Sequence, residues 1–338
     1  MTAPAPPFSR MRALTELYRA FRPNKPKYLP GEYPDLTDKN GIVTGANAGI
    51  GFYVTKLLYE KNCNVIAVVR TEAKGLEASA TIKKEIPSSK GSITVVSGCD
   101  FLDLTTVKQA GEAIKSALGD KPLSIIIHNA GLMAPNSLGT SKQGYEAMFS
   151  VNVLGPQLLQ HFLDPLFLVK DDPLKRIVWV SSGAHFSGFP EYGIHWENPT
   201  FEGVPIGERP GYQTLYGQSK AANIFQAKAW ASKHKEKVQE IGCVSVSCFP
   251  GILKTELVRD WGKMMKFAAS HFFYDGSYGA YTELYAALNP KLTTKDQGAY
   301  IFPFGEIHDP RDDVKLGLTN GTDLKLWGFV QNKISSFY

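Results

Sequence analysis

The sequence has few cysteines and no long hydrophobic run. Its 338 residues include four cysteines, and none shows the Cys-x-x-Cys spacing of a zinc site or a redox pair. We therefore expect free thiols in a reducing compartment and no metal centre. No apolar run approaches the roughly 18–20 residues of a membrane-spanning helix, and nothing resembles a secretory signal peptide. These absences predict a cytoplasmic protein.

Acidic residues are scarce at the start of the chain. Residues 1–30 hold six arginines and lysines but only one acidic residue, Glu16, so this segment accounts for the whole net charge of +5. The remainder is formally neutral, which argues against a nucleic-acid partner. The basic segment is either a solvated leader or a contact for an anionic membrane surface or an acidic partner.

Residues 1–38 are expected to form an extension that contains one amphipathic helix. The apolar residues that recur at helical spacing are Met11, Leu14, Leu17, Tyr18 and Phe21. Three prolines between residues 23 and 30 then end the helix. Docking on the main domain is the favoured interpretation. Peripheral contact with an organelle or lipid-droplet surface and a weak targeting role are the alternatives.

From residue 41 onward, short apolar runs alternate with helical patterns. Strands are expected at residues 42–44, 65–69, 93–96, 124–128, 177–180 and 244–249. Helices are expected at residues 52–61, 106–118, 144–168 and 219–235. This alternation predicts an α/β fold, in which one doubly wound Rossmann domain over residues 39–338 has a parallel sheet flanked by helices.

The first strand leads into a glycine-rich turn, TGANAGIG at residues 44–51. Such a turn uses glycine where the backbone bends sharply and where it must approach a pyrophosphate, which the following helix N-terminus binds. The second strand ends at Arg70 rather than at a carboxylate, and a guanidinium suits the 2′-phosphate of NADP(H). Glu72, two residues further on, keeps NAD(H) open as the less favoured cofactor.

Four motifs in this order resemble those of the short-chain dehydrogenase/reductase superfamily. They are TGxxxGxG at 44–51, NAG at 129–131, YxxxK at 216–220 and PGxxxT at 250–255. The resemblance spans about residues 38–310 and implies a seven-stranded parallel sheet. The predicted cofactor-binding residues are Gly45, Asn47, Gly49, Ile50, Gly51, Arg70, Asp100, Phe101, Asn129, Ala130, Gly131, Tyr216, Lys220, Pro250, Gly251 and Thr255.

Three finer features narrow the resemblance to one branch. They are the IVWVSSGAH segment at residues 177–185, the YGQSK form of the tyrosine motif and the GAYIFP segment at residues 298–303. These are similar to retinol-dehydrogenase-like and WW-domain-oxidoreductase-like members. That branch often handles apolar carbonyls.

Tyr216 and Lys220 are candidates for acid–base chemistry. Carbonyl reduction needs a proton donor near the substrate oxygen and a group that polarises it. A free tyrosine has a pKa near ~10, and an ammonium on the same helix face is expected to lower it. Spacing alone fits an ordinary helix contact equally well, but only Tyr216 among the 15 tyrosines has a lysine four residues later.

The family resemblance completes a catalytic set of Asn152, Ser182, Tyr216 and Lys220. It implies that Ser182, in preference to Ser181, holds the substrate oxygen. It also implies that Asn152 holds a water that relays protons to Lys220, which in turn binds the ribose hydroxyls. His185 is expected to cap a loop, with the substrate mouth as its alternative place, and His128 to be buried structure.

Two segments are candidates for substrate contact. Residues 186–213 form an insertion rich in glycine, proline and aromatic residues, which we interpret as a lid or specificity loop, or else as a static excursion. Residues 257–278 are expected to close over a bulky apolar substrate, with core packing and membrane contact as alternatives. This segment carries Trp261, Met264, Met265, Phe267, Phe272 and Phe273.

These observations predict an NADP(H)-dependent oxidoreductase that interconverts a ketone or aldehyde and its alcohol. The substrate would be a lipid-like, retinoid, sterol-like or specialised-metabolite carbonyl. The alternatives are a non-catalytic NADP(H)-binding redox sensor and a membrane-associated scaffold. Family members often dimerise through the helices carrying Asn152 and Tyr216, so a homodimer is a further expectation, although the long loops of this chain could block it.

Overall fold

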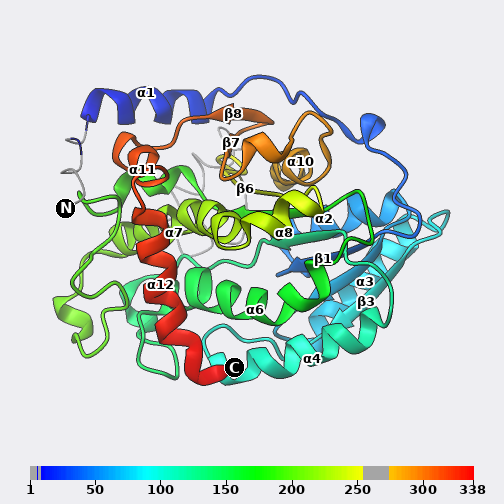
Figure 1. The fold of residues 1–338 in the computed structure, drawn as a ribbon, viewed down its shortest axis with the longest axis horizontal. Coiled ribbons are helices and arrows are strands. Elements are labelled where there is room, and N and C mark those ends of the chain that lie inside the picture. Colours follow the sequence, from blue (N-terminus) through cyan, green and yellow to red (C-terminus); the bar gives the residue numbers. More distant parts are fainter. Residues whose placement is uncertain (1–5, 7–8, 254–273) are drawn as a thin grey trace.

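The computed structural model describes residues 6, 9–253 and 274–338, and its centre is a twisted sheet (Figure 1). Within these residues the sheet has eight strands in the order β3-β2-β1-β4-β5-β6-β7-β8. The strands are β1 (Asn40–Thr44), β2 (Asn64–Val68), β3 (Ser92–Val96), β4 (Ile125–His128), β5 (Arg176–Val180), β6 (Val244–Cys248), β7 (Tyr300–Phe302) and β8 (Glu306–His308). The strand order reverses between β1 and β4, which is the doubly wound arrangement that the alternating pattern predicts.

In the described part of the chain, the sheet has one strand more than the predicted seven. Neighbouring strands from β3 to β7 pair in parallel, but β8 pairs antiparallel with β7, with Tyr300 opposite His308. Each of these last two strands has three residues. Such short strands at the sheet edge give no readable alternation in the sequence, so β8 could not be recognised.

Helices cover both faces of the sheet, and a last helix lies across one of these layers (Figure 1). One face carries α2 (Gly49–Glu60), α3 (Glu72–Glu85) and α10 (Gly276–Leu288). The other carries α4 (Val107–Leu118), α6 (Gly155–Phe167) and α7 (Tyr212–Lys233). The shorter helices are α5 (Ala147–Phe149), α8 (Lys235–Glu240) and α11 (Asp312–Gly317), and α12 (Thr322–Ile334) packs against α7 and α6.

The strands are buried because both faces of the sheet are covered. In β5, Ile177 and Trp179 belong to the core on the α7 side, whereas Val178 and Val180 belong to the core on the α10 side. All five residues of β5 are buried. Alternate side chains thus enter two separate cores, which explains why the predicted strands are continuous apolar runs.

Two predicted helices differ from the structure. The expected helix at 144–168 is α5, then a π-helical segment (Ser150–Leu154), then α6. The expected helix at 219–235 starts seven residues earlier, because α7 spans Tyr212–Lys233. Nearly all of α7 from Leu215 to Ala231 is buried, so its sequence lacks the one-sided pattern by which a surface helix is recognised.

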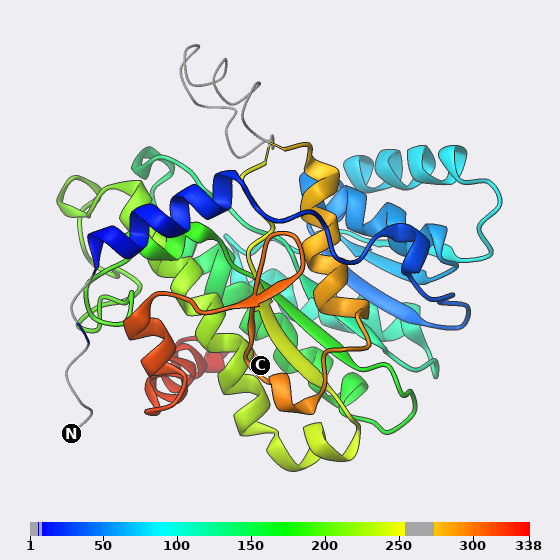
Figure 2. The same ribbon diagram turned by 90° about the horizontal axis from the view of Figure 1, so that it is seen from above.

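The N-terminal extension contains the expected helix, α1 (Arg10–Phe21), and both views show α1 lying along the outside of the domain (Figure 2). After α1 the chain crosses to β1 and buries Tyr28, Tyr33 and Leu36 in the core on the α10 side. The extension is therefore packed against the domain. None of the helices in the described ranges combines the length and hydrophobicity that crossing a bilayer requires.

Candidate active site

A cavity of about 1590 Å³ lies at the carboxyl ends of the parallel strands. Thr44, Val68 and Val180, each the last residue of its strand, line it. This edge, next to the point where the strand order reverses, is where open α/β sheets bind their ligands. The cavity is therefore the candidate active site, and the predicted residues can be located relative to it.

The glycine turn is packed so closely that side chains are excluded. Gly45 has a φ of 67°, and a Cβ at Gly51 would lie 2.4 Å from both the Gly45 carbonyl oxygen and Asn129 Nδ2. Gly45, Asn47, Gly49 and Ile50 line the cavity. Gly51 does not line it, because it packs beneath the turn. The turn thus leaves the start of α2 open to a phosphate group.

The NAG segment joins this turn to the neighbouring strand. Asn129 Nδ2 donates to the Thr44 carbonyl at 2.8 Å, and the Ala130 amide donates to Thr44 Oγ1 at 2.9 Å. Asn129, Ala130 and Gly131 all line the cavity. These bonds hold the ends of β1 and β4 together beside the phosphate-binding turn.

The tip of the second strand presents cationic groups to the cavity. Arg70 is exposed there, and Lys74, one turn into α3, lines the same cavity. Glu72, the NAD(H) alternative, is exposed and is not a lining residue. Lys74 was not predicted, because it lies on α3 and not at the end of the strand, although it lines the same cavity as Arg70.

Asp100 and Phe101 lie in the loop after β3, and both line the cavity. Asp100 Oδ1 accepts from the Leu102 amide at 3.0 Å, and the Phe101 carbonyl accepts from Ser150 Oγ at 2.8 Å. These bonds fix the loop, and the predicted cofactor contact of both residues stays a prediction.

Pro250 and Gly251, two further predicted cofactor-binding residues, also line the cavity. Gly251 has a φ of 122°, a conformation that a side chain would strain. Thr255 and most of the segment 257–278 lie outside the described residues, so their predicted roles stay predictions.

Ser182, Tyr216 and Lys220 meet in the cavity. The Tyr216 hydroxyl is hydrogen-bonded to Ser182, and Lys220 Nζ lies 5.6 Å from the centre of the Tyr216 ring. Ser182 follows β5, whereas the other two project from α7. Ser181 points elsewhere, since its hydroxyl donates to the Lys220 carbonyl at 2.6 Å. The structure therefore brings these three side chains together as the motifs predict.

Lys220 is almost completely buried and makes two hydrogen bonds. Its ammonium donates to the Val180 carbonyl at 2.8 Å and to Asn223 Oδ1 at 3.2 Å. Burial lowers the pKa of Lys220 to about 8, although the charge of Glu283 opposes this. Burial likewise raises the pKa of Tyr216 to about 12, and the Ser182 hydrogen bond opposes it. Desolvation thus decides the direction in which the pKa of Tyr216 moves, and the expected lowering by Lys220 is not found.

Asn152 lies in the π-helical segment, behind the cavity wall. Its Oδ1 accepts from the Leu132 amide at 2.7 Å, and its Nδ2 donates to the Leu132 carbonyl and to Ser219 Oγ, both at 2.9 Å. A Cβ at Gly131 would lie 3.6 Å from Asn152 Oδ1 and 3.5 Å from Lys220 Nζ. Asn152 and Lys220 therefore approach Gly131 together, and each is hydrogen-bonded to other partners.

Three further features are absent from the sequence predictions. Ala13, Glu16, Leu17 and Ala20 of α1 line the cavity, so the extension forms part of its wall. Glu283 of α10 is fully buried, and neither of its carboxylate oxygens has a hydrogen-bond partner. Neither feature could be recognised from the sequence, because both depend on how helices far apart in the chain pack together.

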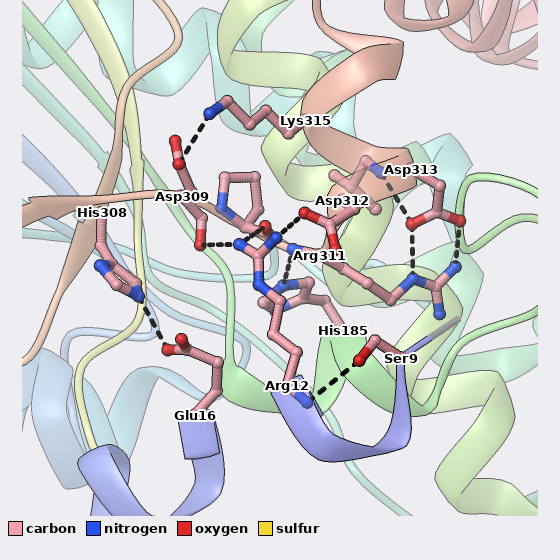
Figure 3. A network of polar contacts seen from close by, with 12 residues as sticks. Ser9, Arg12, Glu16, His185, His308, Asp309, Arg311, Asp312, Asp313 and Lys315 are labelled. Carbon is pink, nitrogen blue, oxygen red and sulfur yellow. Dashed lines mark hydrogen bonds and ion pairs between the residues drawn. The ribbon is translucent and has the colours of Figure 1, made fainter. Parts of the chain in front are cut away.

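The third feature is the environment of His185, which is buried structure rather than a loop cap. Its ring Nδ1 lies 2.8 Å from the Ser182 carbonyl, and its Nε2 accepts from the Arg311 amide at 3.1 Å (Figure 3). Burial lowers the pKa of His185 to about 3, so the ring is neutral with its proton on Nδ1. Arg311 also donates to the carbonyls of Gly188 and Phe189, which ties down the start of the 186–213 segment.

His128 is also buried structure, as expected. It is 3% exposed, and its Nε2 lies 2.8 Å from Gln160 Oε1. It stacks at a tilt against Trp179, with 4.4 Å between the ring centres.

Comparison with known proteins places this arrangement in a family. Residues 39–194 match the family model for short chain dehydrogenase. The chain is 33% identical to the short-chain dehydrogenase/reductase bet4 of Neocamarosporium betae, over 98% of this chain and 96% of the relative. It is also 33% identical to a short-chain dehydrogenase/reductase of Phomopsis amygdali, over 98% and 99% of the two chains. The chain therefore belongs to the short-chain dehydrogenase/reductase family and is an oxidoreductase of that family.

Solved structures share the fold. The crystal structure of NADPH-bound carbonyl reductase from chicken fatty liver has a TM-score of 0.58 at 19% identity, and the match covers 80% of this chain and 98% of that one. An uncharacterised protein from Mycobacterium paratuberculosis has a TM-score of 0.68 at 21% identity, covering 91% and 97%. The retinol-dehydrogenase-like branch stays a prediction.

The buried Glu283 generates a prediction about stability. Burial raises its pKa to about 8, above the usual value of 4.5. The folded state therefore holds a proton that the unfolded chain releases, and stability is lost as pH rises from 4.5 through 8. Glu283→Gln removes this titration. Between pH 5 and pH 8 wild type should therefore lose stability that the variant keeps. The difference in free energy of unfolding, variant minus wild type, should increase by on the order of a few kcal/mol.

Urea unfolding of both proteins at several pH values measures this difference. Glu240→Gln is the matched control, since Glu240 is an exposed glutamate. Parallel stability curves for wild type and Glu283→Gln would contradict the raised pKa.

Proposed function

We propose that this protein is an NADP(H)-dependent oxidoreductase that interconverts an apolar ketone or aldehyde and its alcohol. The observation that carries the proposal is the convergence of Ser182, Tyr216 and Lys220 on one cavity, with the Tyr216 hydroxyl bonded to Ser182. A positioned proton donor beside a second hydroxyl is what carbonyl reduction requires. The same cavity contains a glycine turn in which side chains are excluded.

The residues of this chain divide the chemistry among them. The bound dinucleotide supplies or accepts the hydride. The glycine turn and the N-terminus of α2 would hold its phosphates, and Asn129 fixes that turn. Ser182 would donate a hydrogen bond to the substrate oxygen, and Tyr216 would transfer the proton at that oxygen. The charge of Lys220, 5.6 Å from the tyrosine ring, favours the phenolate.

The proton must then be exchanged with the surroundings. Lys220 and Asn152 both approach the position above Gly131, and a water there would connect them. Asn152 is held by its three hydrogen bonds to Leu132 and Ser219, so its orientation is fixed. We propose that Asn152 positions this relay and does not itself exchange protons, because a carboxamide does not titrate.

The choice of NADP(H) rests on the cations at the tip of the second strand. Arg70 and Lys74 face the cavity, whereas Glu72 does not line it. Two cations, with no carboxylate of β2 or α3 lining the cavity, suit the 2′-phosphate of NADP(H) better than the free 2′-hydroxyl of NAD(H). The NADPH in the carbonyl reductase with the same fold is consistent with this choice.

The substrate end of the cavity indicates an apolar substrate. Beyond Ser182 and Tyr216 it is lined by Leu132, Met133, Leu138, Phe186, Phe249 and Phe302. Such a surface fits a lipid-like or specialised-metabolite carbonyl better than a sugar, because it offers few hydrogen-bond partners. The 186–213 segment contributes Phe186 to this wall, and Arg311 holds it in place.

The oligomeric state of the protein and its compartment in the cell are likewise proposals. The homodimer through the helices carrying Asn152 and Tyr216 is disfavoured by α12, which lies across α6 and α7 (Figure 1). Gln157 Nε2 of α6 donates to the Trp327 carbonyl of α12 at 3.2 Å, so this cover is bonded in place. We propose a monomer in the cytoplasm.

Tyr216→Phe tests the reaction directly. NADPH oxidation with a panel of ketones and aldehydes should fall by about 10²–10⁴-fold in kcat, because the proton donor is lost. NADPH binding, followed by cofactor fluorescence, should be retained. Tyr212→Phe, on the same helix but not lining the cavity, is the matched control and should keep wild-type turnover.

Undiminished turnover in Tyr216→Phe would overturn the assigned role. Tight NADPH binding by wild type with no turnover on any carbonyl would favour the redox-sensor alternative instead.

Arg70→Ala and Lys74→Ala test the cofactor. Losing one charged hydrogen bond to the 2′-phosphate should raise the KM for NADPH by about 10-fold or more, since such a bond contributes about 1.5–3 kcal/mol. The kcat/KM with NADH should change little, because NADH lacks that phosphate. Glu72→Gln is the control, with no loss for NADPH. An equal loss for both nucleotides in Arg70→Ala would contradict a 2′-phosphate contact.

A further inference from the structure

Helix α1 is attached to the domain with its apolar side outward. Met11 is 74% exposed, Leu14 63%, Leu17 51% and Tyr18 66%, and these residues share one face of the helix. An amphipathic helix of a globular protein normally buries this stripe in the core. Together the four side chains form the outer face of α1, a surface that the described residues leave exposed.

The opposite side of α1 is occupied by polar attachments to the body. Arg12 forms an ion pair with Asp312 and donates to the Pro310 carbonyl at 2.9 Å (Figure 3). Glu16 is 7% exposed, and its Oε2 lies 2.8 Å from His308 Nε2. These bonds fix the rotation of the helix about its axis, so the outward direction of its apolar face is built into the structure.

The surroundings of the outer face are positively charged. Arg22 and Lys25 follow directly after α1 and are exposed. Arg19 is 55% exposed in its side chain, and the only acidic residue of the helix, Glu16, is buried against His308 and Arg19. Exposed apolar side chains flanked by arginine and lysine are the composition of an interfacial helix on anionic lipid.

A second copy of this chain is a poorer partner for the same face. In a two-fold symmetric dimer, each outer face would meet itself. Arg22 and Lys25 of one copy would then lie against the same cations of the other, and the one acidic residue of the helix, Glu16, is already paired with Arg19 and His308. Like charges brought together across an interface cost binding energy, whereas acidic phospholipid headgroups complement this charge.

The underside of α1 forms part of the active-site cavity. Ala13, Leu17 and Ala20 line it together with Tyr216 and the apolar wall. Leu17 belongs to both surfaces, since it is exposed and lines the cavity. A surface that covers the outer face would therefore also border the cavity, which places the substrate site next to that surface.

We propose that the outer face of α1 docks on a lipid bilayer containing acidic phospholipids and that the cavity receives its apolar carbonyl substrate from that bilayer. The delivery of substrate from the bilayer rests on the proposed function, whereas the docking of α1 does not. Met11, Leu14 and Tyr18 enter the headgroup region, and the cations behind them contact the phosphates. The body stays outside the membrane, attached through Arg12 and Glu16.

Flotation of the full chain with vesicles tests the docking. Binding is measured on phosphatidylcholine vesicles with and without phosphatidylserine, at low and at high salt. We expect binding to the acidic vesicles that weakens with salt. Leu14→Ser/Tyr18→Ser should reduce that binding at least tenfold. Leu76→Ser/Leu324→Ser is the matched control, because both leucines are exposed on other helices and should not affect binding.

Neither Leu14 nor Tyr18 lines the cavity, so turnover of a small water-soluble carbonyl should be the same in wild type and Leu14→Ser/Tyr18→Ser. Turnover of a long-chain aldehyde presented in vesicles should fall in the double variant only. Absence of turnover with every carbonyl would refute the proposed function and leave flotation as the test of docking.

Equal flotation of wild type and Leu14→Ser/Tyr18→Ser would overturn the docking proposal, as would no binding to acidic vesicles at low salt. Sedimentation velocity without lipid adds a third decisive outcome. A wild-type dimer that the double variant converts to a monomer would assign the outer face to self-association and refute the lipid surface.

Discussion

The buried ammonium of Lys220 is the group around which the active site is arranged. A charge removed from water needs hydrogen-bond partners, and here the Val180 carbonyl and Asn223 provide them. Val180 ends β5 and Asn223 lies one turn further along α7, so the requirement fixes α7 against the end of that strand. Because Ser182 follows β5 and Tyr216 precedes Lys220 on α7, the same contact brings their hydroxyls within hydrogen-bonding distance.

Local patterns were sufficient for the parts of the fold that are built locally. The strands from β1 to β6 are apolar runs because both faces of the sheet are covered, and the glycine turn is readable because only glycine fits there. The π-helical segment that carries Asn152 gives no such pattern, and the partners of Asn152, Leu132 and Ser219, are distant in the sequence. The start of α7 was missed for a related reason, because a helix buried on every side has no polar face.

Elements that join distant parts of the chain could not be predicted in this way. Arg311 comes after the whole sheet, yet its amide bonds His185, and its guanidinium holds the carbonyls of Gly188 and Phe189. His185 in turn contacts the Ser182 carbonyl. The wall of the substrate cavity is thereby connected to the C-terminal region. The connection uses backbone amides and carbonyls, which every residue type has, so the sequence does not reveal it. The same is true of Glu283, whose burial depends on the packing of α10 against the sheet.

Helix α1 shows how far an amphipathic pattern can be interpreted. The spacing of its apolar residues predicts a helix with two different faces, and both the docked and the membrane-bound alternatives use that pattern. The choice between these two alternatives depends on polar residues that lie almost 300 residues further along the chain. Asp312 and His308 lie beside the polar face of α1, where Arg12 and Glu16 meet them. Docking on the domain and contact with lipid are then compatible, because the polar face of α1 makes the first contact and its apolar face makes the second. The cavity lies beneath this helix.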